Sequence, residues 1–194
     1  MKILAILIFS LCSLTSYSQE IKTDSLYTLP TPTHWGIERF PIPIGFAPQI
    51  PYKGVEDIRF TPSWAKAASD EYWTYAFLWC LEGDVKMDAK IIESNMQQYY
   101  SGLNTANGID TLSTIVVSFK EVKKENNDLK TFNGTIDMLD YMAKKPIKLY
   151  CKVHLKSSAK KTHTFIFYEL SPKPQSHSIW QSLDKLWADF KIQK

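Results

Sequence analysis

The hydrophobic pattern of the chain predicts a buried strand at residues 72–81, which read Tyr-Trp-Thr-Tyr-Ala-Phe-Leu-Trp-Cys-Leu. This stretch has the length of a strand, and neither of its two alternating sets of side chains is polar. Such a strand needs hydrogen-bonding neighbours and a layer of helix over at least one face. We therefore expect it near the middle of a sheet that is covered on both faces.

Two later segments have the periodicity of helices. In the first, Asp88 is a suitable N-cap and Gly102 a suitable C-cap. Its apolar positions are spaced four, three and four residues apart, at Ile92, Met96, Tyr99 and Leu103. Its polar face carries Lys90, Glu93, Asn95 and Gln97. This pattern predicts a helix that lies on the sheet.

The second helical segment is close to the C-terminus. Ser178 and Gln181 have the spacing of a capping box. A wide apolar face follows, formed by Ile179, Trp180, Leu183, Leu186, Trp187 and Phe190. We expect this helix to pack on the sheet as well.

Between the two helices the sequence predicts strands at residues 112–122, 129–142, 147–156 and 161–170, with a bulge or turn at Asn133-Gly134. The third strand alternates most clearly. One set of its side chains is apolar and should face the core, namely Ile147, Leu149, Cys151, Val153 and Leu155. The other set should face water, namely Lys148, Tyr150, Lys152, His154 and Lys156.

The part of the chain before the buried strand is rich in proline. Seven of the ten prolines lie between Pro30 and Pro62, interleaved with aromatic residues. Proline excludes helix and aromatic rings need burial, so the segment should run extended across the body of the protein. Within it, residues 55–60 predict a short strand with Asp57 and Arg59 on one face, paired as a salt bridge.

Together these elements predict an α+β fold, in which an antiparallel β-sheet is packed by two main helices and preceded by an extended Pro/aromatic-rich segment. The first 18 residues have the features of a secretory signal peptide: Lys2, an apolar run from Ile3 to Leu11 and the small-x-small pattern at residues 16–18. We expect cleavage near Ser18, a flexible segment at residues 19–33 and a single domain at residues 34–194.

Charge and composition narrow the choice of partners only slightly. A formal net charge of +3 over 194 residues does not indicate nucleic acid as a partner. The apolar run near the N-terminus is too short for a permanent membrane helix, so the mature chain is expected to carry no transmembrane segment and to be periplasmic or extracellular. The oligomeric state is left open.

Export would place Cys80 and Cys151, the cysteines that remain after cleavage, in an oxidising compartment. A disulfide between them would close a long loop and stabilise the fold by about 4 kcal/mol. The alternative is two separate buried thiols, because both residues lie within apolar strand patterns.

Candidate sites are few. The row of Lys148, Tyr150, Lys152, His154 and Lys156 is a candidate face for an anionic ligand or an acidic partner, or else a solubilising surface. A tight turn at Ser158-Ala159 would place His154 opposite His163, where both could bind zinc or copper. The sequence contains no nucleophile elbow, phosphate-binding glycine loop or dinucleotide fingerprint, and we assign it neither catalytic residues nor a cofactor.

Several short segments resemble a group of uncharacterised secreted proteins of Gram-negative bacteria. These segments are Phe40-Pro41, Phe46-Ala47-Pro48, Tyr52-Lys53-Gly54, residues 56–60, Tyr75-Ala76-Phe77 with Trp79, Leu170-Ser171-Pro172 and Ile179-Trp180, with Trp35 and Glu38. The resemblance covers most of the mature chain and implies no activity. The order of elements is also loosely similar to Mog1/PsbP-like and cystatin-like folds, a similarity that concerns fold and not function.

The sequence favours an exported, non-catalytic module that binds a protein or a small molecule. One alternative is an enzyme acting on the cell envelope, for which Glu56, Asp57 and Arg59 would be the first residues to test. Another is a subunit of an envelope complex, with an exposed patch around Trp64 or Trp180.

Overall fold

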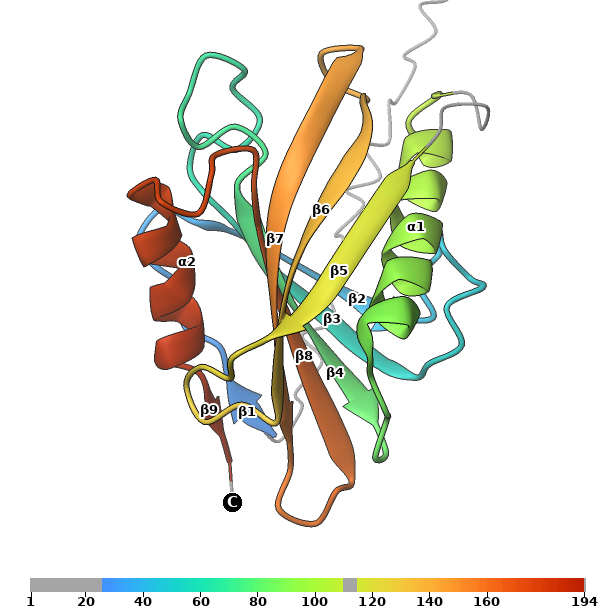
Figure 1. The fold of residues 1–194 in the computed structure, drawn as a ribbon, viewed down its shortest axis with the longest axis vertical. Helices are drawn as coiled ribbons and strands as arrows, with labels where there is room; N and C mark the ends of the chain where they lie inside the picture. The colour runs from blue at the N-terminus through green and yellow to red at the C-terminus, as the bar shows by residue number, and fades with distance from the viewer. Residues whose placement is uncertain (1–25, 110–114, 194) are drawn as a thin grey trace, which may run out of the picture.

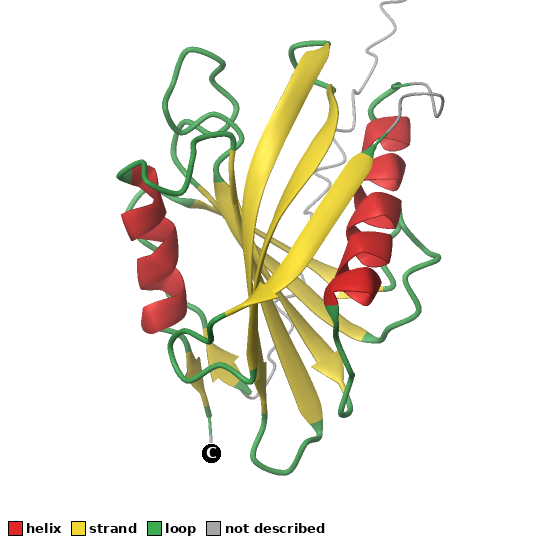
Figure 2. Ribbon diagram, in the orientation of Figure 1, coloured by secondary structure: helices red, strands yellow, loops and turns green. Residues whose placement is uncertain are grey.

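A computed structural model of the protein describes residues 26–109 and 115–193. These residues form three layers, in which one antiparallel sheet lies between two helices (Figure 1). Helix α1 covers one face of the sheet and helix α2 covers the other, as the colouring by secondary structure also shows (Figure 2). The predicted α+β class is confirmed.

The elements follow one another in the order strand, strand, strand, strand, helix, four strands, helix and strand. Their bounds are β1 Tyr27–Thr28, β2 Gly36–Ile42, β3 Gly54–Phe60, β4 Tyr75–Glu82, α1 Ala89–Ala106, β5 Val116–Val122, β6 Lys130–Asp140, β7 Lys145–Ser157, β8 His163–Ser171, α2 Ile179–Ala188 and β9 Lys191–Ile192. The large sheet has the order β2-β3-β4-β8-β7-β6-β5, and β1 pairs with β9 beside it. Every pairing is antiparallel.

Strand β4 confirms the prediction of a strand buried on both faces. Its side chains alternate between two separate cores. Tyr75, Phe77, Trp79 and Leu81 belong to the core beneath α1, and Ala76, Leu78 and Cys80 belong to the core beneath α2. An apolar run without alternation is therefore explained by a helix on each side of the sheet.

The same alternation excludes the candidate disulfide between Cys80 and Cys151. Cys80 lies in the α2-side core and Cys151 in the α1-side core, so the sheet separates the two thiols. Burial raises the pKa of Cys80 to about 11 and the pKa of Cys151 well above its usual range. Both are buried free thiols, the alternative that the sequence had left open.

Helix α1 begins as predicted but ends later. The Asp88 side chain accepts a hydrogen bond from the backbone N–H of Ile91 at 2.9 Å, as an N-cap does. Gly102 lies inside the helix and not at its end. A glycine is needed there because the carbonyl oxygen of Phe46 comes to 1.9 Å from where a Cβ would stand. Asn95, predicted on the polar face, is buried, and its amide donates to the Tyr52 hydroxyl at 3.4 Å.

This close approach makes a prediction that opposes helix propensity. Replacing a helical glycine by alanine normally stabilises a helix by about 1 kcal/mol. Gly102→Ala should instead lower the free energy of unfolding by about 1–3 kcal/mol, because the new methyl group displaces the backbone at Phe46. Urea denaturation measures the change, and Ser101→Ala at the exposed neighbouring position is the control. Stabilisation by Gly102→Ala would contradict the packing described.

Helix α2 has the apolar face that the sequence predicts, but not the predicted cap. Trp180, Leu183, Leu186 and Trp187 are buried against the sheet. The Ser178 side chain makes no capping hydrogen bond. The backbone N–H of Ile179 donates instead to Nδ1 of His177 at 3.2 Å, since Ser178 already has helical backbone angles.

The proline-rich segment contains a strand that the sequence did not reveal. Strand β2 pairs with β3 at the edge of the sheet, where Pro41 is tolerated because an edge strand has only one hydrogen-bonded side. The folded domain also starts before the predicted boundary at residue 34. Tyr27–Thr28 form β1, and the carbonyls of Leu29 and Pro30 accept hydrogen bonds from Arg59.

The predicted signal peptide and the first residues of the mature chain lie outside the described residues. Within the described part of the chain, neither helix is long and apolar enough to cross a membrane.

Candidate functional site

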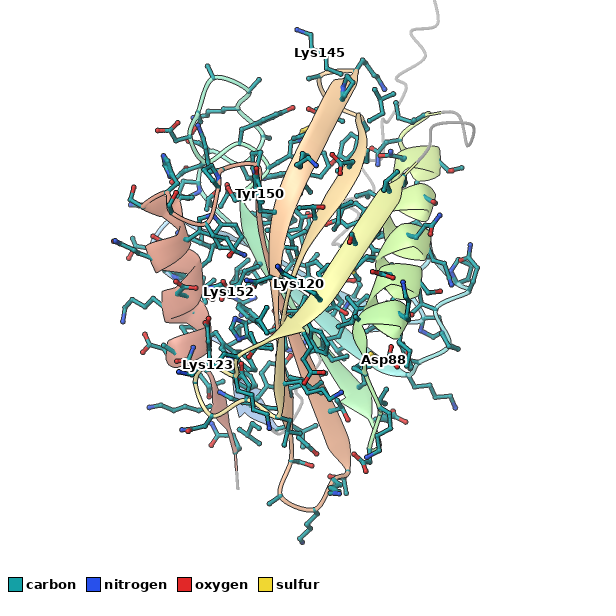
Figure 3. The ribbon with its side chains drawn as sticks, in the orientation of Figure 1. Asp88, Lys120, Lys123, Lys145, Tyr150 and Lys152 are labelled. Carbon is teal, nitrogen blue, oxygen red and sulfur yellow. The ribbon has the colours of Figure 1, made fainter. Side chains whose placement is uncertain are left out.

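The sequence predicted that the row of polar side chains on β7 faces water along its whole length, and this prediction is wrong for part of the row. The row faces the α2 side of the sheet, where the helix covers one end of the row and leaves the other end open (Figure 3). Lys152 is 8% exposed and His154 is 1% exposed, whereas Lys148 is exposed and Tyr150 is half-buried. The predicted binding face is therefore two different environments on one strand.

The covered end contains the His154 network, a group of polar side chains between the sheet and α2. It consists of Asp128, Thr131, Lys152, His154, Glu169, Asp184 and Trp187. Nδ1 of His154 lies 2.6 Å from Oδ2 of Asp128, and its Nε2 lies 3.5 Å from Oε1 of Glu169. The imidazole is therefore held between two buried carboxylates.

The environment of His154 favours its charged form. Burial alone would lower its pKa, but hydrogen bonding and charge at Asp128 and Glu169 outweigh burial and raise the pKa to about 9. Burial raises the pKa of Glu169, and the cations of His154 and Lys152 oppose that rise in part. A histidine and two carboxylates converge here, yet His154 and Glu169 are almost completely buried, so the network is closed to a substrate.

Lys152 joins the network to α2. Its ammonium pairs with Asp184 on the helix, and it lies 3.7 Å from Glu125 and 3.9 Å from Glu169. Lys156 lies two residues beyond His154 on the same face of β7, and its Nζ is 4.1 Å from the centre of the Trp187 ring. These contacts hold α2 on the sheet, so the covered half of the row has a structural role.

The proposed metal pair of His154 and His163 does not form. The β7–β8 hairpin closes between Ser158 and His163, and its register places His154 opposite Phe167. The turn contains more residues than the two required for the predicted pairing. The described residues contain no group of three or more His, Cys, Asp or Glu side chains that could hold a metal ion.

The three residues named for the enzyme alternative are split between the two faces of the sheet. Asp57 and Arg59 form the predicted ion pair, which is buried on the α2 side. Glu56 points to the α1 side, where Oε1 accepts a hydrogen bond from the Tyr99 hydroxyl at 2.7 Å. Burial raises the pKa of Glu56 to about 8, and its hydrogen bond with Tyr99 lowers it only in part. Two carboxylates therefore do not meet at this position.

Glu56 belongs to a second closed cluster, formed with Trp79, Tyr99 and Tyr168 beneath α1. The Glu56 carboxylate, the Trp79 indole N–H and the Tyr168 hydroxyl each keep one buried polar atom without a hydrogen-bond partner among the described residues. All four side chains are buried. Because at most 4% of any of these four residues is exposed, the cluster is part of the core and not an accessible site.

The open end of the row is the candidate site. Here the sheet forms a shallow groove of about 410 Å³. We call it the strand-face groove, and its lining comes from β5, β6, β7 and the segment between β8 and α2: Ser118, Phe119, Lys120, Asn133, Gly134, Thr135, Tyr150 and Gln175. Its volume lies in the range typical of ligand sites.

The register of the sheet arranges the polar groups of this groove in two rows. Ser118, Thr135 and Tyr150 are direct cross-strand neighbours, and Lys120 and Asn133 form the next row. Continuous pairing through Asn133 also shows that the bulge or turn predicted at Asn133-Gly134 is absent, because both residues pair on each side within β6. The straight strand keeps the two rows aligned.

Two further features of the groove are the close contact between Phe119 and Gly134 and the buried amide oxygen of Asn133. The Phe119 ring lies so close to Gly134, on the α1 side of the sheet, that a Cβ at Gly134 would be 2.4 Å from the ring. The Asn133 amide nitrogen donates to Oε1 of Gln175 at 3.3 Å, while Asn133 Oδ1 is buried without a partner among the described residues. The unsatisfied acceptor of Asn133 is therefore buried beneath the surface of the groove.

Of the residues predicted for binding, Tyr150 alone lines this groove, and Lys148 lies outside it, paired with Asp137 at 3.0 Å. Sequence reasoning missed Ser118, Lys120 and Thr135, because they lie on other strands and only the register brings them beside Tyr150. It also missed Gln175, which lies in the segment between β8 and α2. The alternation of residues 130–140 would have placed Asn133 and Thr135 on one face, but not beside Tyr150.

A second hollow, of about 330 Å³, lies between the segment before β2 and helix α2. It is mainly apolar, with Pro30, Pro32, Trp35 and Leu186 in its walls. Lys185 and Asp189 at its rim pair with each other at 2.8 Å. The patch predicted around Trp180 is absent, because Trp180 is buried in the core and its indole N–H donates to the Lys173 carbonyl.

Comparisons of the chain with protein-family models, with curated proteins and with solved structures find no match. The resemblance to uncharacterised secreted proteins therefore stays a prediction.

Proposed function

We propose that the protein is an exported, non-catalytic binding module whose ligand occupies the strand-face groove. The observation that carries the proposal is a groove on an otherwise well-packed sheet whose walls present hydroxyl and amide groups that come from three strands and from the segment between β8 and α2. Polar groups of this kind orient a ligand through hydrogen bonds.

The distribution of ionisable groups favours binding over catalysis. The ionisable groups of the His154 network and of the Asp57–Arg59 pair lie close to groups of opposite charge, and His154, Glu169, Asp57 and Arg59 are buried. Among the described residues that line the groove, Lys120 and Tyr150 are the ionisable ones. Neither has a carboxylate or histidine beside it in that lining to act as a partner in acid-base chemistry.

Native mass spectrometry of the mature protein from the periplasm of its host tests the proposal. We expect a chain that begins near residue 19 and retains a non-covalent adduct. Tyr150→Ala should remove most of the adduct, because it removes the largest side chain in the groove. Trp35→Ala, in the wall of the second hollow, is the matched aromatic control and should leave the adduct in place.

Three outcomes would contradict the proposal. The first is a wild-type protein with no adduct that also binds nothing from a periplasmic extract. The second is an adduct that Tyr150→Ala retains and Trp35→Ala loses. The third is a bound molecule that the protein converts to another compound during incubation, since that would make it an enzyme.

A further inference from the structure

We infer that the ligand of the strand-face groove is an acidic saccharide, a sugar chain that carries a carboxylate. This inference rests on the proposed function, because it names the class of ligand for the same groove. Four properties of the lining support it: its hydrogen-bonding groups, its aromatic ring, its charge and its openness.

The hydrogen-bonding groups match a polyhydroxylated molecule. Ser118 and Thr135 present hydroxyls, and Gln175 presents an amide that accepts a hydrogen bond from the Asn133 amide nitrogen. Hydroxyl and amide groups both donate and accept hydrogen bonds, as a sugar hydroxyl does. Neighbouring strands lie about 4.7–4.9 Å apart, so the polar groups within one row of the groove repeat at a spacing comparable to the width of a sugar ring.

The aromatic ring supplies an apolar surface beside these polar groups. Tyr150 is half-buried and packs against the α2-side core, which holds its position. One face of a pyranose ring consists mainly of C–H groups, and such a face packs on an aromatic ring while the hydroxyls at its edge form hydrogen bonds. The Tyr150 hydroxyl adds a further donor and acceptor to the groove.

The charge of the groove selects an acidic sugar. Lys120 is exposed, and no ion pair with a carboxylate is found for it among the described residues, whereas Lys152 in the same row is paired with Asp184. The lining itself contains no carboxylate. An ammonium without a matching anion in the groove complements a ligand with negative charge.

The shape of the groove agrees with a chain-like ligand. Strand β5 is the edge strand of the sheet, and Lys120 and Tyr150 come from β5 and β7, with β6 between them (Figure 3). A saccharide that contacts both side chains would therefore cross three strands. A compact apolar molecule would find a better place in the second hollow, which is lined by proline, tryptophan and leucine.

Isothermal titration calorimetry with two matched tetrasaccharides tests the inference: an oligogalacturonate and the corresponding oligogalactoside, which differ in a carboxylate at C6. We expect the wild-type protein to bind the acidic sugar at least about fivefold more tightly at low salt, and the preference to weaken as salt rises. Lys120→Gln should abolish the preference. Lys123→Gln, an exposed lysine outside the lining, is its control and should keep it.

The contribution of the aromatic ring has its own variants. Tyr150→Ala should weaken binding of the acidic sugar about tenfold, and Tyr150→Phe should remain within about threefold of the wild type, because it keeps the ring. Thermal melting of each variant shows that it is folded before it is titrated.

The inference is wrong if the tetrasaccharides do not bind, if both bind equally, or if the Lys120→Gln and Tyr150→Ala variants bind like the wild type. These failures differ from a failure of the proposed function. A periplasmic adduct that Tyr150→Ala removes, but whose mass is not that of a sugar acid, would leave the binding module intact and overturn only the class of ligand.

Discussion

Replacing Asp128 by alanine is expected to lower the free energy of unfolding by about 3–5 kcal/mol. Asp128 is buried and accepts hydrogen bonds from three side chains: Trp187 Nε1 at 2.8 Å, Thr131 Oγ1 at 2.8 Å and His154 Nδ1 at 2.6 Å. The alanine variant would leave an indole N–H without a partner and a buried imidazolium with less compensating charge. The effect is large because one carboxylate links two strands and α2.

The matched control for this prediction lies on β6. Asp137 is a carboxylate too, but it is partly exposed and pairs with the exposed Lys148. Asp137→Ala should therefore change the free energy of unfolding by no more than about 1 kcal/mol. Urea denaturation of both variants, followed by the fluorescence of the tryptophans, measures the difference. If the two variants lose similar stability, Asp128 does not hold α2 on the sheet.

The second large effect is a loss of stability at alkaline pH. The pKa of His154 rises from an ordinary value of about 6.5 to about 9 in the folded protein, so folding favours the protonated imidazole. The stabilisation is complete below pH about 6.5 and is lost as the pH rises through about 9. At 1.36 kcal/mol per pKa unit, the loss across this window is about 3 kcal/mol.

The cause of this pH dependence can be separated with two variants. His154→Gln keeps a polar side chain but cannot titrate, so the fall in stability between pH 6.5 and 9 should become much smaller. Glu56, on the other face of the sheet, contributes in the same direction, because its pKa of about 8 also favours the protonated form in the folded state. The Glu56→Gln substitution should therefore be introduced into both the wild-type protein and the His154→Gln variant before their changes in stability with pH are compared.

The measurement is the free energy of unfolding from urea titrations at a series of pH values. Asp128, Glu169 and Lys152 face the imidazole or its carboxylates, and α2 adds Asp184, so the titration reports on the whole His154 network. A wild-type protein whose stability is constant from pH 6.5 to 9 would show that His154 is not held in its charged form.

The two predictions share a physical origin. Both follow from the His154 network, which lies beneath α2 and is nearly closed to water. In such a place the loss of a hydrogen-bond partner or of a proton lowers the free energy of unfolding strongly. The same closure separates this network from the strand-face groove, although Lys152 and Tyr150 are only two residues apart on β7. One strand thus contributes stability at one end and a candidate ligand site at the other.

Much of the local structure follows from the sequence alone. The apolar run of β4, the Asp88 cap of α1, the wide apolar face of α2 and the strands β3, β5, β7 and β8 all depend on side-chain periodicity, which acts over a few residues. The Asp57–Arg59 pair follows from the two-residue repeat of a strand. These features determine the α+β class.

The tertiary structure decided the features that depend on which surfaces meet. The alternating pattern of β7 predicted a core face and a solvent face, but α2 covers half of the second face, so Lys152 and His154 are buried. Gly102 looked like a helix end, but the close approach of Phe46 requires a glycine inside the helix. The groove unites Ser118, Thr135 and Tyr150 because the register of three strands aligns them, and register depends on long-range pairing that no local pattern contains.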